Sequence, residues 1–430
     1  MHSFEYRNGS LHCEDVDLAR VAEEFGTPLY IYSAATVLDH YTRLDAALKS
    51  LDHRICYAVK ANSNRAILKL LADAGAWFDI VSGGELFRVL KAGGDAKKCT
   101  FAGVGKSREE IEYALDQGVH SFNVESEAEL ELIDKIASEK NVRAPIALRA
   151  NPDVDPHTHQ YISTGSHENK FGIALERLAD VCARAAKMRK IDIVGLQMHI
   201  GSQITEAGPF AAAIKKVAPL VKQLKDKYGI KFFSIGGGMG IIYKRALESG
   251  AGKWWHDHGG EASAFSVGDY ADAIVPPLRE LDIQVLIEPG RFLVGNAGVL
   301  LTRVRYIKET AAKKFAIVDA GMNDLIRPAL YQSYHQIVPV KQSDKIDNRK
   351  IDIVGPVCES GDFFAQDREM PPLREGDLLA IMSAGAYGFV MASNYNSRPL
   401  PAEALVRGDK FSLIRKRQTF DDIVRDELPT

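Results

Sequence analysis

A lysine, Lys60, directly follows a short apolar run in the segment Tyr57-Ala58-Val59-Lys60-Ala61-Asn62-Ser63-Asn64. A lysine at such a position can act as a reactive amine. The run Ile55–Val59 is too short for a helix, and a helical pattern begins at Arg65. A lysine at the end of a buried strand loses hydration, which lowers its pKa and makes a neutral amine available for a Schiff base. A solvated lysine just past a strand is the plainer interpretation, and Lys60 alone does not decide between the two.

Four glycines lie within five residues at the end of another apolar run, at Gly236, Gly237, Gly238 and Gly240. Without side chains, their backbone N–H groups can approach an anion closely, and a following helix N-terminus adds a favourable dipole. A tight turn also uses glycines. The density of glycines favours a phosphate site, but the spacing is not the GxGxxG of a dinucleotide site.

Two further strand ends carry polar residues that can act together. Glu288-Pro289-Gly290-Arg291 offers a carboxylate, which can hold a heterocyclic nitrogen protonated, and a guanidinium, which can pair with a phosphate or carboxylate. His199-Ile200-Gly201-Ser202-Gln203 offers a flat ring and a hydroxyl donor. Structural alternatives are a buried ion pair between Glu288 and Arg291 and a core histidine satisfied by a carbonyl.

A thiol and a carboxylate are adjacent in the segment Val357-Cys358-Glu359-Ser360-Gly361-Asp362. The thiol can act as a general acid and the carboxylate can bind an ammonium group, although a lone cysteine is more often inert. Metal binding is not expected, because no zinc-like ligand set accompanies the histidines of two loop-like stretches, His157, His159, His167, His256 and His258.

The elements that must position these residues alternate between short β-rich runs and helical patterns. Eight strands are predicted, at 55–59, 77–81, 99–102, 121–124, 146–149, 193–198, 231–235 and 284–287. Helical spacing lies between most of them, at 65–74, 85–92, 108–117, 127–140, 175–188 and 211–227. This alternation predicts a (β/α)₈ barrel, with a doubly wound open sheet as the alternative. The barrel is favoured because the chemically capable residues fall at strand ends, namely Lys60, Asp79, Asn151, His199, Gly236–Gly238 and Glu288.

Beyond residue 296 strand-like runs dominate, at 299–308, 315–318, 351–354, 378–381 and 411–415. We therefore predict a barrel domain at 34–295 and a mainly antiparallel β domain formed by 1–33 with 296–430. A helix is expected at Val16–Phe25, ending at Gly26. The stretch 249–268, with Trp254 and Trp255, is expected to be a loop insertion before the eighth strand.

Composition narrows the classes of partner. The chain has 430 residues, of which 46% are hydrophobic and 26% charged, and its net charge is 54 − 57 = −3. Because the sequence has no basic stripe, we do not expect nucleic acid or membrane surfaces as partners. No run approaches the length of a membrane span, and we expect no signal peptide. A reducing, cytoplasmic setting fits five scattered cysteines without a CxxC pair, at 13, 56, 99, 182 and 358.

Together these motifs resemble those of the alanine-racemase-like, fold-type III decarboxylases that depend on pyridoxal 5′-phosphate (PLP). The matching segments are Tyr57–Asn62, His199–Gln203, Gly236–Ile241, Glu288–Arg291 and Cys358–Asp362. Two more, Gly321–Tyr331 and Tyr395–Glu403, look like the diaminopimelate decarboxylases within that group. The resemblance runs nearly end to end. Met239, where the family commonly carries leucine, is expected to be harmless because backbone amides bind the phosphate.

The resemblance implies a role for each matching residue. Lys60 would form the Schiff base with PLP, Asp79 would lie near it, His199 would stack on the ring and Glu288 would pair with the ring nitrogen. The phosphate would lie on Gly236–Gly238 with Ser202 and Tyr387, close to Pro289 and Gly290. Arg291, Arg327 and Tyr331 would hold substrate carboxylates, Glu359 would receive the distal ammonium, and Cys358 would donate a proton.

The same resemblance implies an activity and an assembly. The expected reaction is decarboxylation of meso-2,6-diaminopimelate to L-lysine, in a homodimer whose partner chain supplies the segment that includes Cys358 and Glu359. One alternative is decarboxylation of ornithine, lysine, arginine or carboxynorspermidine, for which Arg327 should be dispensable. A non-catalytic PLP-binding barrel would lack the β domain. A racemase needs a second base, and the sequence identifies none.

Overall fold

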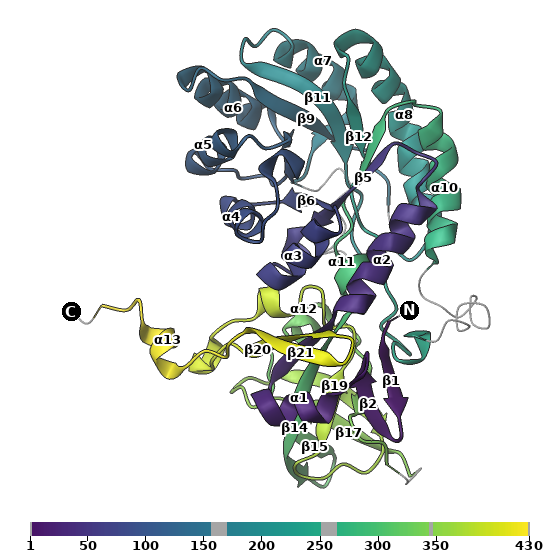
Figure 1. Cartoon of the computed structure of the whole chain (residues 1–430), viewed down its shortest axis with the longest axis vertical. Coiled ribbons are helices and arrows are strands. Elements are labelled where there is room, and N and C mark those ends of the chain that lie inside the picture. The colour runs from purple at the N-terminus through teal and green to yellow at the C-terminus, as the bar shows by residue number, and fades with distance from the viewer. Residues whose placement is uncertain (1, 156–169, 251–264, 344–346, 429–430) are drawn as a thin grey trace. The chain divides into compact units, whose positions relative to one another are not determined.

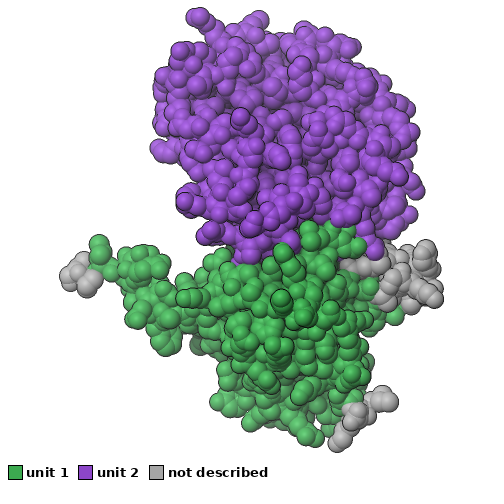
Figure 2. Space-filling view, in the orientation of Figure 1, with its two compact units in different colours: residues 1–39, 242–262, 293–430 green, residues 40–241, 263–292 purple. Residues whose placement is uncertain are grey.

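The computed structural model describes residues 2–155, 170–250, 265–343 and 347–428. The chain forms two compact units, drawn in different colours in Figure 2. One comprises residues 40–241 and 263–292, and the other comprises residues 1–39, 242–262 and 293–430. The boundaries proposed from the sequence, at 33/34 and 295/296, stay a prediction. In the part of the chain described, no helix is both long and apolar enough to span a membrane.

The first unit is a closed barrel of eight parallel strands, each paired with the next, and the last strand pairs with the first. The predicted (β/α)₈ barrel is therefore confirmed and the open sheet is wrong. The strands are β5 (His53–Ala58), β6 (Trp77–Ile80), β7 (Cys99–Phe101), β8 (Ser121–Val124), β9 (Ala144–Asn151), β11 (Ile191–Met198), β12 (Phe232–Ser234) and β13 (Gln284–Ile287). A short strand, β10 (Ile173–Ala174), adds to the edge of β9.

Helices surround these strands (Figure 1). They are α3 (Arg65–Asp73), α4 (Gly83–Lys91), α5 (Arg108–Gln117), α6 (Glu127–Glu139), α7 (Leu175–Ala185), α8 (Gly208–Tyr228) and α10 (Val267–Arg279). Local sequence sets their ends: a capping box from Ser107 and Glu110 starts α5, and Gly118, with φ of 69°, ends it. A second capping box, from Ser266 and Asp269, starts α10. The predicted loop at 249–268 therefore extended into the first turn of α10, which begins at Val267. Most of that stretch, including Trp254 and Trp255, lies outside the described residues.

Strand register decides which side chains enter the barrel. At one level an apolar cluster fills the interior, formed by Cys56, Ala147, Phe232 and Leu286. Because side chains alternate along a strand, the residues two positions further on also point inward. After Ala147, Phe232 and Leu286 these residues are polar, whereas Ala58 follows Cys56. Register neighbours on this face are Arg149, Gln197 and Ser234 along β9, β11 and β12, and Asp79, Thr100 and Ser121 along β6, β7 and β8. The interior is therefore polar next to the carboxyl ends of the strands, where barrel enzymes place their active sites.

The second unit is built on a mixed sheet of order β18-β17-β15-β14-β4-β20-β21. Strand β19 also pairs with β14, and β16 pairs with β19. Most pairings are antiparallel, as predicted; β15–β17 and β20–β4 are parallel. The strands are β4 (Leu29–Ser33), β14 (Gly298–Glu309), β15 (Lys314–Val318), β16 (Ile337–Pro339), β17 (Arg349–Val354), β18 (Phe363–Met370), β19 (Leu378–Ile381), β20 (Ala402–Arg407) and β21 (Lys410–Arg415). N-terminal strand β4 thus lies between two C-terminal strands.

Smaller elements complete this unit. Strands β1 (Phe4–Arg7), β2 (Ser10–Cys13) and β3 (Val16–Asp17) form a small sheet, and the helices are α1 (Leu18–Phe25), α12 (Arg327–Tyr331) and α13 (Phe420–Val424). Helices α2 (Ala34–Ala47) and α11 (Arg291–Val294) fall at the junctions of the two units in the sequence. The predicted helix at 16–25 starts two residues later, because Asp17 is its N-cap, and it ends at Gly26 as expected.

Candidate active site

The amine of Lys60 lies at the carboxyl end of the barrel beside a buried carboxylate. Strand β5 ends at Ala58, and Lys60 sits in the single turn η1 (Val59–Ala61). Its Nζ donates to Asp79 Oδ2 at 2.5 Å; the lysine side chain is 39% exposed and the aspartate side chain is fully buried. The amine is therefore held by an ion pair and partly open to solvent, which lies between the desolvated and the solvated lysine that the sequence left open. The second oxygen of Asp79 has no hydrogen-bond partner in the described part of the chain.

The glycine loop packs so closely that only glycine fits. A Cβ on Gly237 would lie 2.1 Å from the Glu288 carbonyl oxygen, and one on Gly238, whose φ is +114°, would lie 2.4 Å from the Gly201 carbonyl oxygen. Gly236 donates to Ser234 Oγ at 3.3 Å, and the backbone of Glu288 donates to the Gly236 carbonyl at 2.9 Å. The loop is thus fastened to the end of β13 and leaves its backbone close to the strand ends, as an anion site requires.

Glu288 presents a carboxylate inside the barrel. Ser234 Oγ donates to one of its oxygens at 2.6 Å, and Gln197 Nε2 donates to the other at 3.0 Å. Burial, followed by the nearby Asp79 charge, raises the pKa of Glu288 to about 7, and the two donors act in the opposite direction. The alternative of a Glu288–Arg291 ion pair is not seen, because Arg291 instead donates to Ser202 Oγ at 3.0 Å.

His199 follows β11 and is buried. Its Nδ1 accepts a hydrogen bond from the Gly237 backbone at 3.2 Å, so the ring proton of the neutral imidazole is on Nε2. Burial, together with the positive charges of Arg149 and Lys60, lowers the pKa of His199 well below its ordinary value. The imidazole is consequently neutral at physiological pH and offers a flat apolar face rather than a proton.

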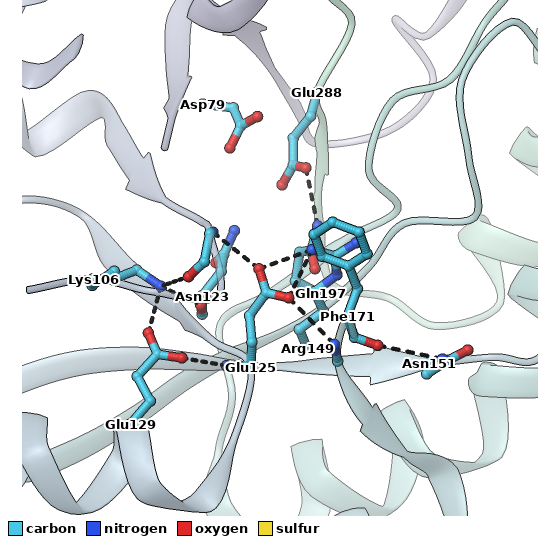
Figure 3. Close-up of polar contacts among 12 residues, drawn as sticks. Asp79, Lys106, Asn123, Glu125, Glu129, Arg149, Asn151, Phe171, Gln197 and Glu288 are labelled. Carbon is cyan, nitrogen blue, oxygen red and sulfur yellow. Dashed lines mark hydrogen bonds and ion pairs between the residues drawn. The ribbon is translucent and has the colours of Figure 1, made fainter. Parts of the chain in front are cut away.

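A buried charge network lies at the carboxyl ends of β7, β8 and β9 (Figure 3). Arg149 Nη1 donates to both oxygens of Glu125 at 2.9 Å, and Glu125 also accepts from the backbones of Gly103 and Gly172. Lys106 Nζ donates to the Gly103 and Asn123 carbonyls and to Glu129 Oε1 at 2.8, 2.9 and 2.5 Å, which uses all three of its protons. The guanidinium of Arg149 also lies over the Phe171 ring at 4.9 Å. This network fixes the ends of β8 and β9.

The remaining predicted residues belong to the β unit. The Cys358 thiol is exposed, and the backbone of Cys358 donates to Asn396 Oδ1 at 2.9 Å. Glu359 Oε2 accepts from the Tyr395 hydroxyl at 2.6 Å.

Arg327 begins α12 and is buried; its Nη2 donates to Ser333 Oγ at 3.3 Å, and its guanidinium lies 5.6 Å from the Tyr331 ring centroid and 5.4 Å from that of Tyr243. Tyr387 has a positive φ of 54°, which is rare for a non-glycine residue.

The structure thus brings the predicted cofactor residues of the barrel together, and it places Cys358, Glu359, Arg327, Tyr331 and Tyr387 in the other unit. Sequence reasoning missed the inward polar residues Arg149, Gln197 and Ser234 near the strand ends, and their neighbours Glu125 and Lys106, which follow β8 and β7. A signal was present, because Gln197 and Ser234 precede His199 and Gly236 by two positions and therefore share their face. For metal, no group of three or more ligand side chains occurs among the described residues; His157, His159, His167, His256 and His258 lie outside them.

Comparison with known proteins agrees with this geometry. Residues 34–295 match the pyridoxal-binding domain of the pyridoxal-dependent decarboxylases. The chain belongs to that family. It is 49% identical over 428 residues to a diaminopimelate decarboxylase of Pseudomonas aeruginosa, with 99% of each chain covered. It is also similar to the crystal structure of diaminopimelate decarboxylase from Helicobacter pylori complexed with L-lysine, with 40% identity, a TM-score of 0.88 and coverage of 95% of this chain and 98% of that one.

A second solved structure, the diaminopimelate decarboxylase from M. jannaschii in complex with L-lysine, is 37% identical, with a TM-score of 0.90 and coverage of 99% and 98%. A lysine/ornithine decarboxylase from Vibrio vulnificus is only 22% identical at a TM-score of 0.76, so that likeness extends to the fold alone.

The donor set of the barrel fits the cofactor of a pyridoxal-dependent decarboxylase. PLP carries an aldehyde, a basic ring nitrogen and a phosphate, and each finds a chemical counterpart here. Lys60 offers the amine, Glu288 offers a buried carboxylate, and the glycine loop offers backbone close to the strand ends. The orphaned oxygen of Asp79 is a further buried acceptor beside the amine. The residues present therefore match the group that the family uses.

Proposed function

We propose that this chain decarboxylates meso-2,6-diaminopimelate to L-lysine and CO₂ with PLP as cofactor. The observation that carries the proposal is the Lys60–Asp79 pair at the mouth of a barrel whose interior also holds Glu288 and whose rim carries the triple glycine. The full-length likeness to diaminopimelate decarboxylases, including two solved with L-lysine, supports the choice of substrate.

In this proposal Lys60 holds the cofactor covalently, and the remaining barrel residues place it. Gly236, Gly237 and Gly238 would leave space for the phosphate beside their backbone, while the N–H groups of Gly236 and Gly237 stay donated to Ser234 Oγ and His199 Nδ1. Ser202, whose oxygen accepts from Arg291, would donate its hydrogen to the phosphate. His199, neutral and buried, would offer its flat face to the cofactor ring. When bound, PLP supplies an electron sink for the pair left behind as CO₂ departs.

Glu288 would keep the ring nitrogen of PLP protonated, and a protonated ring withdraws electrons more strongly. Asp79 sits where a protonated amine at Lys60 is stabilised, since their atoms are 2.5 Å apart. Pro289 and Gly290 continue from Glu288 and let the backbone turn beside the glycine loop.

In this proposal the β unit supplies most of the groups that bind the substrate and the group that protonates the product. Arg327 and Tyr331, with Arg291 of the barrel, hold carboxylates. Glu359 receives the distal ammonium: its Oε2 accepts from Tyr395, and the exposed side chain leaves Oε1 available to a cation. The exposed thiol of Cys358 delivers a proton to the carbon that has lost CO₂, and Tyr387 adds a hydroxyl for phosphate or substrate.

We further propose a homodimer in which the segment with Cys358 and Glu359 completes the site of the partner chain. The exposure of Cys358 supports this arrangement, since a proton donor must reach a substrate held in a barrel. A cytoplasmic location fits five cysteines that are all free thiols. The domain boundaries at 33/34 and 295/296 belong to the same proposal.

A substrate comparison tests the activity. Purified protein is given meso-diaminopimelate, ornithine, lysine or arginine, with and without added PLP, and release of CO₂ is measured. We expect release from meso-diaminopimelate only, and dependence on PLP after the cofactor is removed. Arg327→Met should abolish that activity, because a dicarboxylate loses its second anchor. Comparable turnover of ornithine, unaffected by Arg327→Met, would instead support a monocarboxylate decarboxylase.

A further inference from the structure

We propose that Gln197 and Ser234 are positioning residues that hold the Glu288 carboxylate in place and in its charged form for the ring nitrogen of the cofactor. This inference rests on the proposed function, since it concerns the group that Glu288 meets. It gives a positioning role to two interior side chains that belong to none of the motifs found in the sequence.

Strand register places the three side chains next to one another. Gln197 and Ser234 are direct neighbours on β11 and β12, and Ser234 is the neighbour of Leu286 on β13. Glu288 follows Leu286 by two positions, so it emerges on the same inner face. Gln197 and Ser234 are 1% and 0% exposed, and Glu288 is 6% exposed. Water therefore does not compete for the carboxylate, and its hydrogen bonds must come from these neighbours.

Each carboxylate oxygen has its own donor. The Ser234 hydroxyl donates to Oε1 at 2.6 Å and the Gln197 amide to Oε2 at 3.0 Å. The serine has no freedom to turn away, because its oxygen accepts from Gly236 and its single hydrogen is thus directed at Glu288. The glutamine is oriented by the same logic, since the reverse amide orientation would put an oxygen against a carboxylate oxygen.

These bonds also tie the ring-nitrogen end of the site to its phosphate end. Gly236 donates to Ser234, Ser234 donates to Glu288, and the Glu288 backbone donates back to the Gly236 carbonyl at 2.9 Å. The distance between the carboxylate and the glycine loop is therefore set by a closed ring of hydrogen bonds.

Burial opposes the charged form of this carboxylate and brings its pKa to about 7, and the two donors counteract that effect. A hydrogen bond to an ion corresponds to about one pKa unit or more. Without one donor this pKa rises further, so a smaller fraction of Glu288 is ionised at pH 7. Binding of a protonated ring nitrogen should weaken by about fivefold as a consequence.

The test is the binding of PLP, and of an analogue in which a C–H replaces the ring nitrogen, to cofactor-free protein at pH 7 without substrate. Ser234→Ala and Gln197→Met should each weaken PLP binding about fivefold or more and change binding of the analogue less than twofold. Ser234→Thr keeps the hydroxyl and should restore PLP binding. Ser121→Ala is the matched control, because Ser121 is an equally buried inward hydroxyl with no hydrogen-bond partner among the described residues.

Equal losses for PLP and the analogue, or no loss for either, would overturn the positioning role. If Ser234→Ala does not fold, Gln197→Met carries the comparison. Failure of the unmodified chain to bind PLP would overturn the proposed function itself. If the chain binds PLP but shows no decarboxylase activity, a loss of PLP binding without loss of analogue binding in Ser234→Ala and Gln197→Met would still support this inference.

Discussion

Neutralising Glu125 should destabilise the barrel far more than neutralising an exposed carboxylate, because Glu125 compensates a buried cation. The side chains of Arg149 and Glu125 are 7% and 1% exposed, and Arg149 Nη1 contacts both carboxylate oxygens at 2.9 Å (Figure 3). Glu125→Gln keeps the shape of the side chain but leaves the guanidinium without its counter-charge inside the barrel. It also weakens the acceptors for the Gly103 and Gly172 backbones.

The magnitude follows from that burial. Removing one partner of a buried pair typically costs about 3–5 kcal/mol, since an uncompensated charge remains. Lys69 and Asp73 form an i,i+4 pair on α3 whose side chains are 64% and 62% exposed. Asp73→Asn should therefore cost only about 0.3–0.5 kcal/mol. The two substitutions make the same chemical change, so their difference isolates the effect of burial.

Urea unfolding of the cofactor-free protein, followed by circular dichroism and by tryptophan fluorescence, provides the measurement. We expect the midpoint for Glu125→Gln to fall well below those of Asp73→Asn and the unmodified chain, with little change in the slope. Equal midpoints for the two variants would refute the claim that the Arg149–Glu125 pair stabilises the ends of β8 and β9.

Four further predictions follow from the same structure. Lys60→Ala should abolish the visible absorbance of bound PLP, and a band that survives near ~420 nm would remove Lys60 as the attachment point. Cys358→Ala should lower kcat much more than it raises KM, whereas unchanged turnover excludes the thiol from the reaction. Mixing inactive Lys60→Ala with inactive Cys358→Ala protein should restore part of the activity if partner chains share sites; exchanged dimers without activity would contradict this. Burial raises the pKa of Asp324 from its ordinary value to about 7, so the folded state keeps a proton that the unfolded chain has already released. Stability of the cofactor-free protein should therefore fall as pH rises from about 4 to about 7, and Asp324→Asn should flatten this slope in thermal unfolding; an unaltered slope would be evidence against it.

The sequence predicted the barrel well because its strands are short apolar runs separated by helices with clear periodicity. The bounds of β8 and β13 agree with the prediction, and those of α5 do as well. Residues at strand ends were also found, since chain order alone places them on one face of a closed barrel.

What the sequence could not supply is the partner of each polar group. Asp79 was predicted only to lie near the imine, and its ion pair with Lys60 depends on the register of β5 and β6. Gln197 and Ser234 look like ordinary polar residues until β11, β12 and β13 are placed side by side. Likewise, β18 and β20 were missed because charged residues interrupt their apolar pattern, as at Asp367–Glu369 and Glu403.

Location of the cofactor bond is the most direct test of the central claim. The protein is mixed with PLP and treated with borohydride, which makes the lysine–cofactor bond permanent, and is then digested and examined by peptide mass spectrometry. We predict a pyridoxyl phosphate mass on the peptide that contains Lys60. Modification confined to another lysine, or none at all, would contradict the account of this site.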